Sequence, residues 1–166
     1  MRFSSAAEQF GFSAEHHASV GSTNDLAMAY LREGGTSHHF VIADEQTGGR
    51  GRLGRVWVSK PGNLYASLAL VDPCDMAFGF QLGFVAALSI HEAMGRVGVN
   101  PSRLSLKWPN DVLLDQAKLS GILIEGARLS DARFGAVIGC GINIAHHPED
   151  TPYRATDLAS SGIDTQ

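Results

Sequence analysis

The second half of the chain is dominated by short apolar runs that read as strands rather than helices. Residues 118–127 and 134–144 are both dense in Ile, Val and Leu, a composition typical of β-strands. We expect these two runs to form a hairpin. Two further short strands are expected at 104–107 and 112–114. So many strands in close succession argue against a regular alternation of helices with parallel strands.

The first half of the chain adds helical signals and three more strands. Ser22 is a candidate N-cap, and the apolar residues after it predict a helix that stops at Gly34. The stretch 76–97 has apolar residues at helical spacing and predicts a longer helix. Strands are expected at 16–20, 39–43 and 64–71. We therefore predict one α+β domain, with a mixed, largely antiparallel sheet and the helices packed on one face.

Size and charge restrict the class of protein. A chain of 166 residues is long enough for one domain with its own core. Its net charge of −4 gives no general attraction to nucleic acid or to anionic membranes. Two cysteines cannot build a disulfide framework, and no apolar leader segment begins the chain. We expect a cytoplasmic protein that binds no DNA. We also expect that no apolar stretch approaches the length needed to span a membrane.

The basic loop at residues 49–55, which reads GRGRLGR, contrasts with this acidic balance. Its glycines permit close backbone approaches, and Arg50, Arg52 and Arg55 offer planar donors for carboxylate or phosphate oxygens. The spacing formally matches a dinucleotide-binding fingerprint, but an apolar strand with Trp57 follows instead of a helix. An RG-type nucleic-acid patch would usually repeat within a polar tract. The loop therefore predicts an ordered anion site.

Three more motifs follow at fixed positions. The segment KWPND at 107–111 places Pro109 so that it forms a turn presenting Lys107, Asn110 and Asp111 together. The segment KLSGILIE at 118–125 begins a strand with a lysine and a close-approach glycine. GCGIN at 139–143 ends a strand with flexible backbone and one amide side chain. Each motif taken singly also fits a plain turn or a solvated strand end.

In this order, STN at 22–24, Gln46 with GRGRLGR and Trp57, KWPND, KLSGILIE and GCGIN resemble biotin protein ligases of the biotin/lipoate ligase superfamily. The resemblance runs from about Ser22 to about Leu158. It implies a fold like that of class II aminoacyl-tRNA synthetases and biotin synthetases. It also implies formation of biotinyl-adenylate from biotin and ATP with Mg²⁺, and transfer of biotin to a lysine of a biotin carboxyl carrier domain.

The resemblance assigns roles by position. Lys118, Arg50 and Arg52 correspond to the catalytic cations, and Asp111 to a weak Mg²⁺ ligand. The implied biotin-binding residues are Ser22, Thr23, Asn24, Gln46, Gly49, Arg50, Gly51, Arg52, Lys118, Gly121 and Leu123. The implied ATP-binding residues are Arg52, Arg55, Trp57, Lys107, Asn110, Asp111, Lys118, Gly141, Ile142 and Asn143.

The resemblance also implies a domain organisation. Residues 1–166 would form the catalytic domain, without an N-terminal DNA-binding domain and truncated before the small C-terminal β domain of the family. Homodimers are common in the family, which makes a homodimer an option here. Two alternatives stay open: a lipoate ligase or octanoyltransferase of the same fold, with Cys140 as the one candidate nucleophile, and a non-enzymatic biotin- or nucleotide-binding module.

Overall fold

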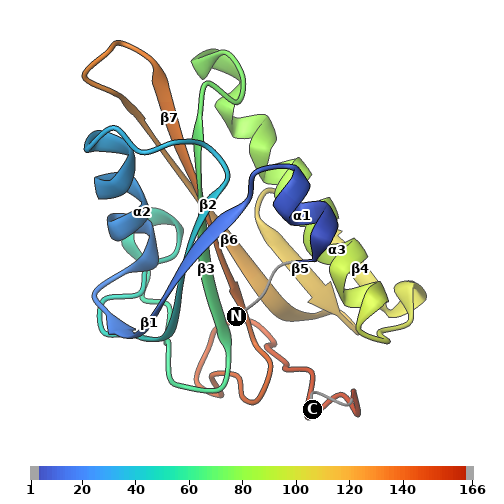
Figure 1. Ribbon diagram of the computed structural model, residues 1–166. Helices are drawn as coiled ribbons and strands as arrows, with labels where there is room; N and C mark the ends of the chain where they lie inside the picture. The colour runs from blue at the N-terminus through green and yellow to red at the C-terminus, as the bar shows by residue number, and fades with distance from the viewer. Residues whose placement is uncertain (1–3, 164–166) are drawn as a thin grey trace.

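A seven-stranded sheet organises the chain in the computed structural model, which describes residues 4–163 (Figure 1). The strand order is β1-β2-β3-β7-β6-β5-β4. Among the strands of the described residues, β1 and β2 pair in parallel and each other pair of neighbouring strands is antiparallel. The strands are β1 (Ser13–Val20), β2 (His39–Gln46), β3 (Leu64–Val71), β4 (Leu104–Lys107), β5 (Asp111–Leu114), β6 (Ala117–Arg128) and β7 (Phe134–Ile142). The α+β class and the largely antiparallel sheet are thus confirmed.

The strand predictions hold for all seven strands, with differences at their ends. The bounds of β3 and β4 are those expected, and β6 and β7 form the expected hairpin, in which Ser120 pairs with Ile142 and Arg128 with Phe134. β1 begins at Ser13 rather than at residue 16. This outer strand is largely exposed, so it lacks the alternation of apolar residues that marks a half-buried strand.

The helices begin and end close to the predicted signals. They are α1 (Ser5–Gln9), α2 (Thr23–Arg32) and α3 (Leu82–Arg96), with short 3₁₀ turns η1 (Arg52–Gly54), η2 (Met76–Gln81) and η3 (Pro101–Arg103). α2 ends where Gly34 takes a φ of +92°, a conformation that suits glycine. The predicted helix over 76–97 starts as η2, where the Asp75 side chain accepts a hydrogen bond from the Ala77 N–H, and continues as α3.

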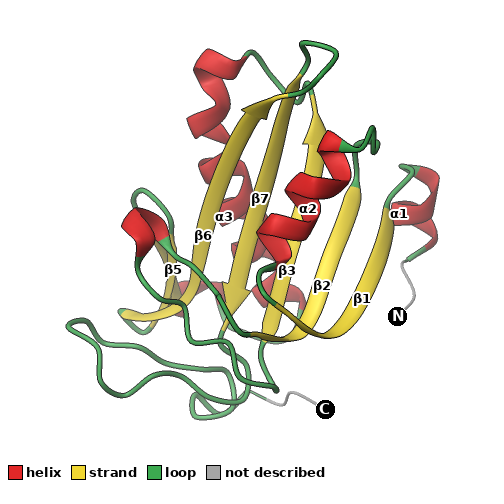
Figure 2. Cartoon of the chain, turned by 90° about the vertical axis from the view of Figure 1, so that its left-hand side faces the viewer, coloured by secondary structure: helices red, strands yellow, loops and turns green. Residues whose placement is uncertain are grey.

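The prediction that the helices pack on one face of the sheet is wrong. Figures 1 and 2 show α2 and α3 on opposite faces of the sheet. Neighbouring residues of β7 explain why: Val137 packs in the cluster with α2, and Ile138 packs against the cluster with α3. Successive side chains of a strand point to opposite faces. The dense apolar composition of β6 and β7 therefore reflects burial on both faces rather than one.

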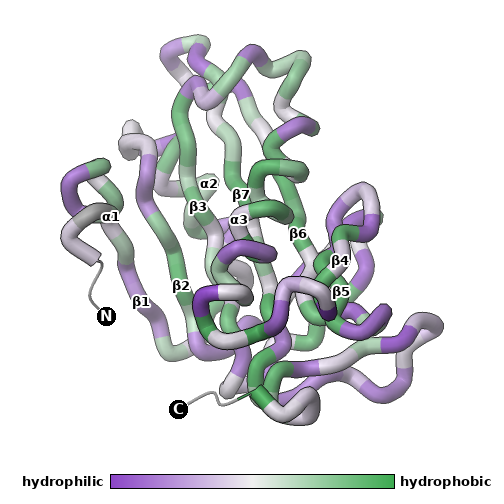
Figure 3. Tube along the Cα trace, turned by 90° about the vertical axis from the view of Figure 1, so that its right-hand side faces the viewer, coloured by the Kyte–Doolittle hydropathy of each residue, from purple (hydrophilic) through white to green (hydrophobic). Residues whose placement is uncertain are grey.

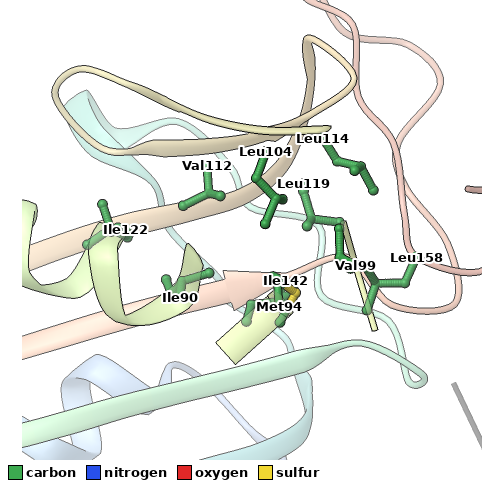
Figure 4. Close-up of a cluster of buried hydrophobic side chains, with 11 residues drawn as sticks. Ile90, Met94, Val99, Leu104, Val112, Leu114, Leu119, Ile122, Ile142 and Leu158 are labelled. Atoms are coloured by element: carbon green, nitrogen blue, oxygen red, sulfur yellow. The ribbon is translucent and has the colours of Figure 1, made fainter. Parts of the chain in front are cut away.

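The larger core lies between α3 and the sheet. Figure 4 shows Ile90 and Met94 of α3 beside Ile122 of β6 and Ile142 of β7. The smaller core lies under α2, where Ala27, Met28 and Leu31 pack with Val41, Ala69 and Val137. Burying each such side chain stabilises the fold by about 1.5–3 kcal/mol. These two cores fix the start of α2 and the ends of β6 and β7 relative to one another.

The outer face of α3 is unusually apolar for a helix on the surface. Phe84 and Leu88 of α3, and Phe80 of the preceding η2, are each at least half exposed, and most of the N-terminal half of α3 is coloured hydrophobic in Figure 3. The stretch Met76–Arg96 is long and apolar enough to cross a membrane by length and composition alone. The expectation from the sequence that no apolar stretch approaches such a length is therefore wrong. One such helix is weak evidence of a membrane span, since the inner face of α3 packs on the sheet.

Candidate active site

One cavity brings together most of the residues predicted from the motifs. It has a volume of about 270 Å³ and lies where the start of α2 meets β6, β7 and the glycine–arginine loop. Its lining contains five cations, Arg50, Arg52, Arg55, Lys107 and Lys118, against one acid, Asp111. The other predicted residues in the lining are Ser22, Thr23, Asn24, Gln46, Gly51, Trp57, Asn110, Gly121, Leu123 and Gly141.

A polar corner is built at the first turn of α2. The Gln46 side-chain oxygen accepts hydrogen bonds from the Thr23 N–H at 2.8 Å and the Thr23 hydroxyl at 3.0 Å. The Gln46 amide nitrogen donates to Ser59 Oγ at 3.0 Å. One of its two hydrogens is therefore left for a ligand. Ser22 is buried, and within the described residues its hydroxyl makes no capping bond to α2, so it too can bind a ligand.

Asn24 belongs to a buried network. Its amide nitrogen donates to Glu125 Oε2 at 2.7 Å, and its side-chain oxygen accepts a hydrogen bond from Ser67 Oγ at 2.6 Å. Ser67 Oγ also lies 2.7 Å from Thr23 Oγ1. Both polar ends of Asn24 are thus occupied by the protein, which suits orientation of Thr23 better than direct ligand contact. The sequence motifs did not identify Ser67, although a serine within an apolar strand is a usable signal.

Replacing Ser67 with alanine tests this network. The change leaves the buried Asn24 oxygen without its donor, so we expect a loss of about 1–3 kcal/mol in the free energy of unfolding. Urea denaturation measures it. Ser89→Ala is the control, because Ser89 is exposed on α3 and its hydroxyl bonds only the Val85 carbonyl. Equal, small effects of the two variants would contradict a role for Ser67 in the network.

Glycines let the indole of Trp57 lie flat against the sheet. A Cβ at Gly121 would lie 2.8 Å from Cζ3 of the Trp57 ring, and one at Gly141 would lie 2.5 Å from its Cε2. No real Cβ contact is this short, so either side chain would displace the ring. The prediction of close approach at Gly121 is confirmed. The buried Trp57 Nε1 has no hydrogen-bond partner within the described chain.

Lys118 lines both this cavity and an adjoining one. Its ammonium is 2.8 Å from Asp111 Oδ1 and sits over two aromatic rings, at 5.3 Å from the Trp57 centroid and 5.2 Å from that of Tyr153. Both charged side chains of this pair are about 15% exposed. The Lys118 N–H donates to the Arg154 carbonyl at 2.8 Å, which ties the segment around Tyr153 to β6. The motifs did not identify Tyr153.

The glycine–arginine loop lines the cavity and folds back on itself. The Gly51 N–H donates to the Arg55 carbonyl at 2.7 Å, and Leu53 takes a φ of +58° at the tip. Arg52 Nη1 donates to Asn110 Oδ1 at 3.3 Å, which links this loop to the KWPND turn. The Arg50 guanidinium donates to both oxygens of Asp25, at 2.6 and 2.8 Å. These hydrogen bonds hold the pKa of Asp25 below its ordinary value and raise the pKa of Arg50.

Three predicted site residues do not line this cavity. Gly49 is buried, and a Cβ there would lie 2.5 Å from Ser59 Oγ. The Ile142 side chain is buried in the core under α3. Asn143 lines an adjoining cavity of about 230 Å³ that shares the Trp57, Lys118 and Tyr153 walls, and its amide donates to the Thr156 carbonyl at 3.0 Å. Their roles in binding stay predictions.

Among residues 4–163 no group of three His, Cys, Asp or Glu side chains is placed to hold a metal ion. Asp111 is the one carboxylate that lines the cavity, and its charge is balanced by Lys118. A Mg²⁺ ion commonly binds through one or two carboxylates together with substrate phosphates. This donor set therefore fits a metal that arrives with a nucleotide rather than one held by the protein alone.

Comparison with known proteins identifies the family of the chain. The chain matches the model of the biotin/lipoate A/B protein ligase family over residues 17–143. It is 39% identical over 132 residues to the biotin–[acetyl-CoA-carboxylase] ligase of Paracoccus denitrificans, a match that covers 80% of this chain and 55% of that protein. The chain thus spans about half the length of this curated relative.

Two solved structures share the fold. Biotin protein ligase from Aquifex aeolicus in complex with biotin and ATP aligns with a TM-score of 0.75 and 36% identity, covering 93% of this chain and 63% of that one. Biotin protein ligase from Leishmania major in complex with biotinyl-5-AMP aligns with a TM-score of 0.76 and 29% identity, covering 92% and 67%. With the family model matched over most of its length, the chain belongs to the biotin/lipoate A/B protein ligase family.

Proposed function

We propose that this chain carries the catalytic machinery of an ATP-dependent biotin protein ligase. The observation that supports it most is the meeting of four cations from three separate segments, Arg50, Arg52, Lys107 and Lys118, in one cavity beside a polar corner. A carboxylate and a triphosphate repel each other, so joining them requires fixed positive charge around both. The relatives named above are ligases of biotin, and two of them were solved with ligands of this reaction.

The proposed reaction has two steps. A carboxylate oxygen of biotin attacks the α-phosphorus of ATP, the bond to the leaving pyrophosphate breaks, and biotinyl-adenylate forms. The amine of an acceptor lysine then attacks the carbonyl carbon, releases AMP and loses a proton. No covalent bond to the protein is needed, so the contribution of the protein is positioning and charge stabilisation. In this proposal Lys118 and Arg52 neutralise the carboxylate and the α-phosphate.

The polar corner suits the ureido ring of biotin. The free amide hydrogen of Gln46 and the hydroxyl of Ser22 can donate hydrogen bonds to its carbonyl oxygen. The hydroxyl oxygen of Thr23, in the same lining, can accept a hydrogen bond from one of its N–H groups. The flat indole of Trp57 and the glycines beneath it offer an apolar wall for the rest of the molecule. The proposed biotin and ATP subsites therefore meet at Lys118.

In this proposal Asp111 would help to hold a Mg²⁺ ion that enters with ATP, and the ion would supply positive charge for the leaving pyrophosphate. The acceptor is a lysine of a biotin carboxyl carrier domain, and a homodimer remains an option of the proposal. A cytoplasmic location is part of the same proposal. The two cysteines, Cys74 and Cys140, are both free thiols, which suits a reducing compartment.

An octanoyltransferase would need a cysteine nucleophile, and the Cys140 thiol is poorly suited to that role. Burial raises its pKa to about 11, so at neutral pH almost none of it is the reactive thiolate. We therefore expect Cys140→Ala to retain adenylate formation and acyl transfer. Cys74→Ala is the matched control. Loss of acyl transfer in Cys140→Ala alone, with the fold intact by circular dichroism, would favour the octanoyltransferase alternative.

The direct test incubates the chain with biotin, MgATP and a biotin carboxyl carrier domain. We expect biotin-dependent release of pyrophosphate and a single covalent mass increase on one carrier lysine. Lipoate in place of biotin should give neither product. Lipoate turnover with no biotin turnover would assign the chain to the lipoate branch, and tight biotin binding without pyrophosphate release would make it a non-enzymatic binding module.

A further inference from the structure

Arg50 is the one arginine of the loop whose guanidinium is held by two carboxylates in the described structure. Its two terminal nitrogens donate to the two oxygens of Asp25, at 2.6 and 2.8 Å, and Nη2 lies 3.6 Å from Glu125 Oε1. Asp25 is in the first turn of α2, and Glu125 is on β6. Glu125 closes the KLSGILIE motif, yet neither acid has a role in the reaction proposed above.

These acids are anchored to the fold. Glu125 Oε2 accepts the 2.7 Å hydrogen bond from Asn24, which is itself held by Ser67. Asn24 and Ser67 are at most 4% exposed. A carboxylate tied to a buried network keeps its position, so it can fix the cation that approaches it. Asp25 is held less firmly, because its side chain is 61% exposed.

Few other bonds connect the loop tip to the rest of the protein. The bonds from Gly51 and Arg55 stay within the loop, and Leu53 is 87% exposed. Arg52 reaches Asn110 at 3.3 Å, which is a long hydrogen bond. The bidentate bond from Arg50 is therefore the strongest connection between the tip and α2.

We propose that Asp25 and Glu125 are positioning residues that hold Arg50 and thereby keep the glycine–arginine loop over the cavity. The contact is between partly exposed charges, so it is worth little energy and the loop can open for substrate entry. Because this role adds to the proposed function, its effect on the reaction depends on that function. Its effect on the position of the loop in the protein without ligands does not depend on that function.

Limited proteolysis of the protein without ligands measures how firmly the glycine–arginine loop is held. Thermolysin cleaves before large apolar residues, here Leu53 and Val56, so changes at arginine do not alter its target sites. We expect Asp25→Asn to speed cleavage within the loop about threefold to fivefold, since opening of a surface pair costs up to about 1 kcal/mol. Glu125→Gln keeps an acceptor for Asn24 and should speed cleavage less. High salt should bring the rate for the unmodified chain towards that of Asp25→Asn.

Two controls separate positioning from a local effect on α2. In an Arg50→Gln background, Asp25→Asn should cause no further acceleration, whereas loss of helix stability would accelerate cleavage in both backgrounds and overturn the proposal. Asp115, between β5 and β6, accepts hydrogen bonds from Nε and Nη2 of Arg103 in another bidentate pair far along the chain from the loop. Asp115→Asn breaks that pair and should leave loop cleavage unchanged. Unchanged cleavage in Asp25→Asn would also overturn the proposal.

The same variants are then followed with biotin and MgATP. Positioning predicts that Asp25→Asn raises the KM for biotin and speeds release of the adenylate, while kcat for pyrophosphate exchange changes little. The reverse pattern, with kcat lowered and KM unchanged, would contradict a positioning role. If the unmodified chain makes no adenylate, the proposed function fails, and the thermolysin result alone decides whether Asp25 and Glu125 hold the loop.

Discussion

Replacing Lys118 with alanine should lower the rate of adenylate formation by about 10²–10³-fold, the usual effect of removing one preorganised charge contact. Lys118 is the cation that contacts Asp111 and both aromatic rings, at the point where the proposed subsites for biotin and ATP meet. Without it the carboxylate and the α-phosphate would approach each other with less neutralisation. Biotin-dependent exchange of labelled pyrophosphate into ATP measures the effect.

The same change also affects stability, which the sequence alone did not suggest. A lysine at a strand start would be expected to contribute little packing, but this one is about 15% exposed and paired. Removing it leaves Asp111 without its partner, at a cost of about 1–3 kcal/mol. The double variant Lys118→Ala with Asp111→Asn should recover part of that stability and none of the exchange activity.

Lys60→Ala is the matched control, since Lys60 is exposed and lies outside the cavity. It should leave both exchange and stability unchanged. Unchanged pyrophosphate exchange in Lys118→Ala would remove this residue from its assigned role. Recovery of full activity by the double variant would show that the loss arose from an unpaired Asp111 and not from loss of a cation at the reacting groups.

Gly141→Ala is expected to have the second large effect, although it adds a single methyl group. The new Cβ would overlap the Trp57 indole, with Cε2 at 2.5 Å, and the ring can only move into the cavity or away from the sheet. Either movement removes the wall between the proposed biotin and ATP subsites. We expect biotin affinity to fall by more than about tenfold, or 1.4 kcal/mol, as measured by calorimetry.

Gly95→Ala provides the comparison, because a Cβ at Gly95 of α3 would meet only Pro101 Cγ, at an ordinary 3.8 Å. Alanine in a helix is favoured over glycine, so this variant should be neutral or more stable. If Gly141→Ala binds biotin as tightly as Gly95→Ala does, Trp57 is not part of the binding site in the way proposed.

The strands and the main motifs could be predicted from the sequence because both depend on local composition. The apolar runs of β6 and β7 and the helix start after Ser22 are signals within a few residues of each other. The motif residues were recognised by their order along the chain. The order of motifs along a chain does not say how far apart they lie in space, but Arg52, Lys107 and Lys118 do line one cavity.

Features that depend on tertiary contacts could not be predicted in this way. The placement of α2 and α3 on opposite faces depends on which side of β7 each residue points to, as Val137 and Ile138 show. Asp25 and Glu125 are 100 residues apart in the sequence, yet both contact Arg50. Ser67 and Tyr153 lie outside the motifs, so only the folded structure brings them to the site.

A crystal structure of this chain with biotin and a non-hydrolysable ATP analogue tests the central claim most directly. We expect biotin to bind between Gln46 and Trp57, with its carboxylate and the α-phosphate both within hydrogen-bond distance of the Lys118 ammonium. Biotin bound elsewhere on the protein, or the two ligands in separate cavities with Lys118 still bonded only to Asp111, would contradict the account.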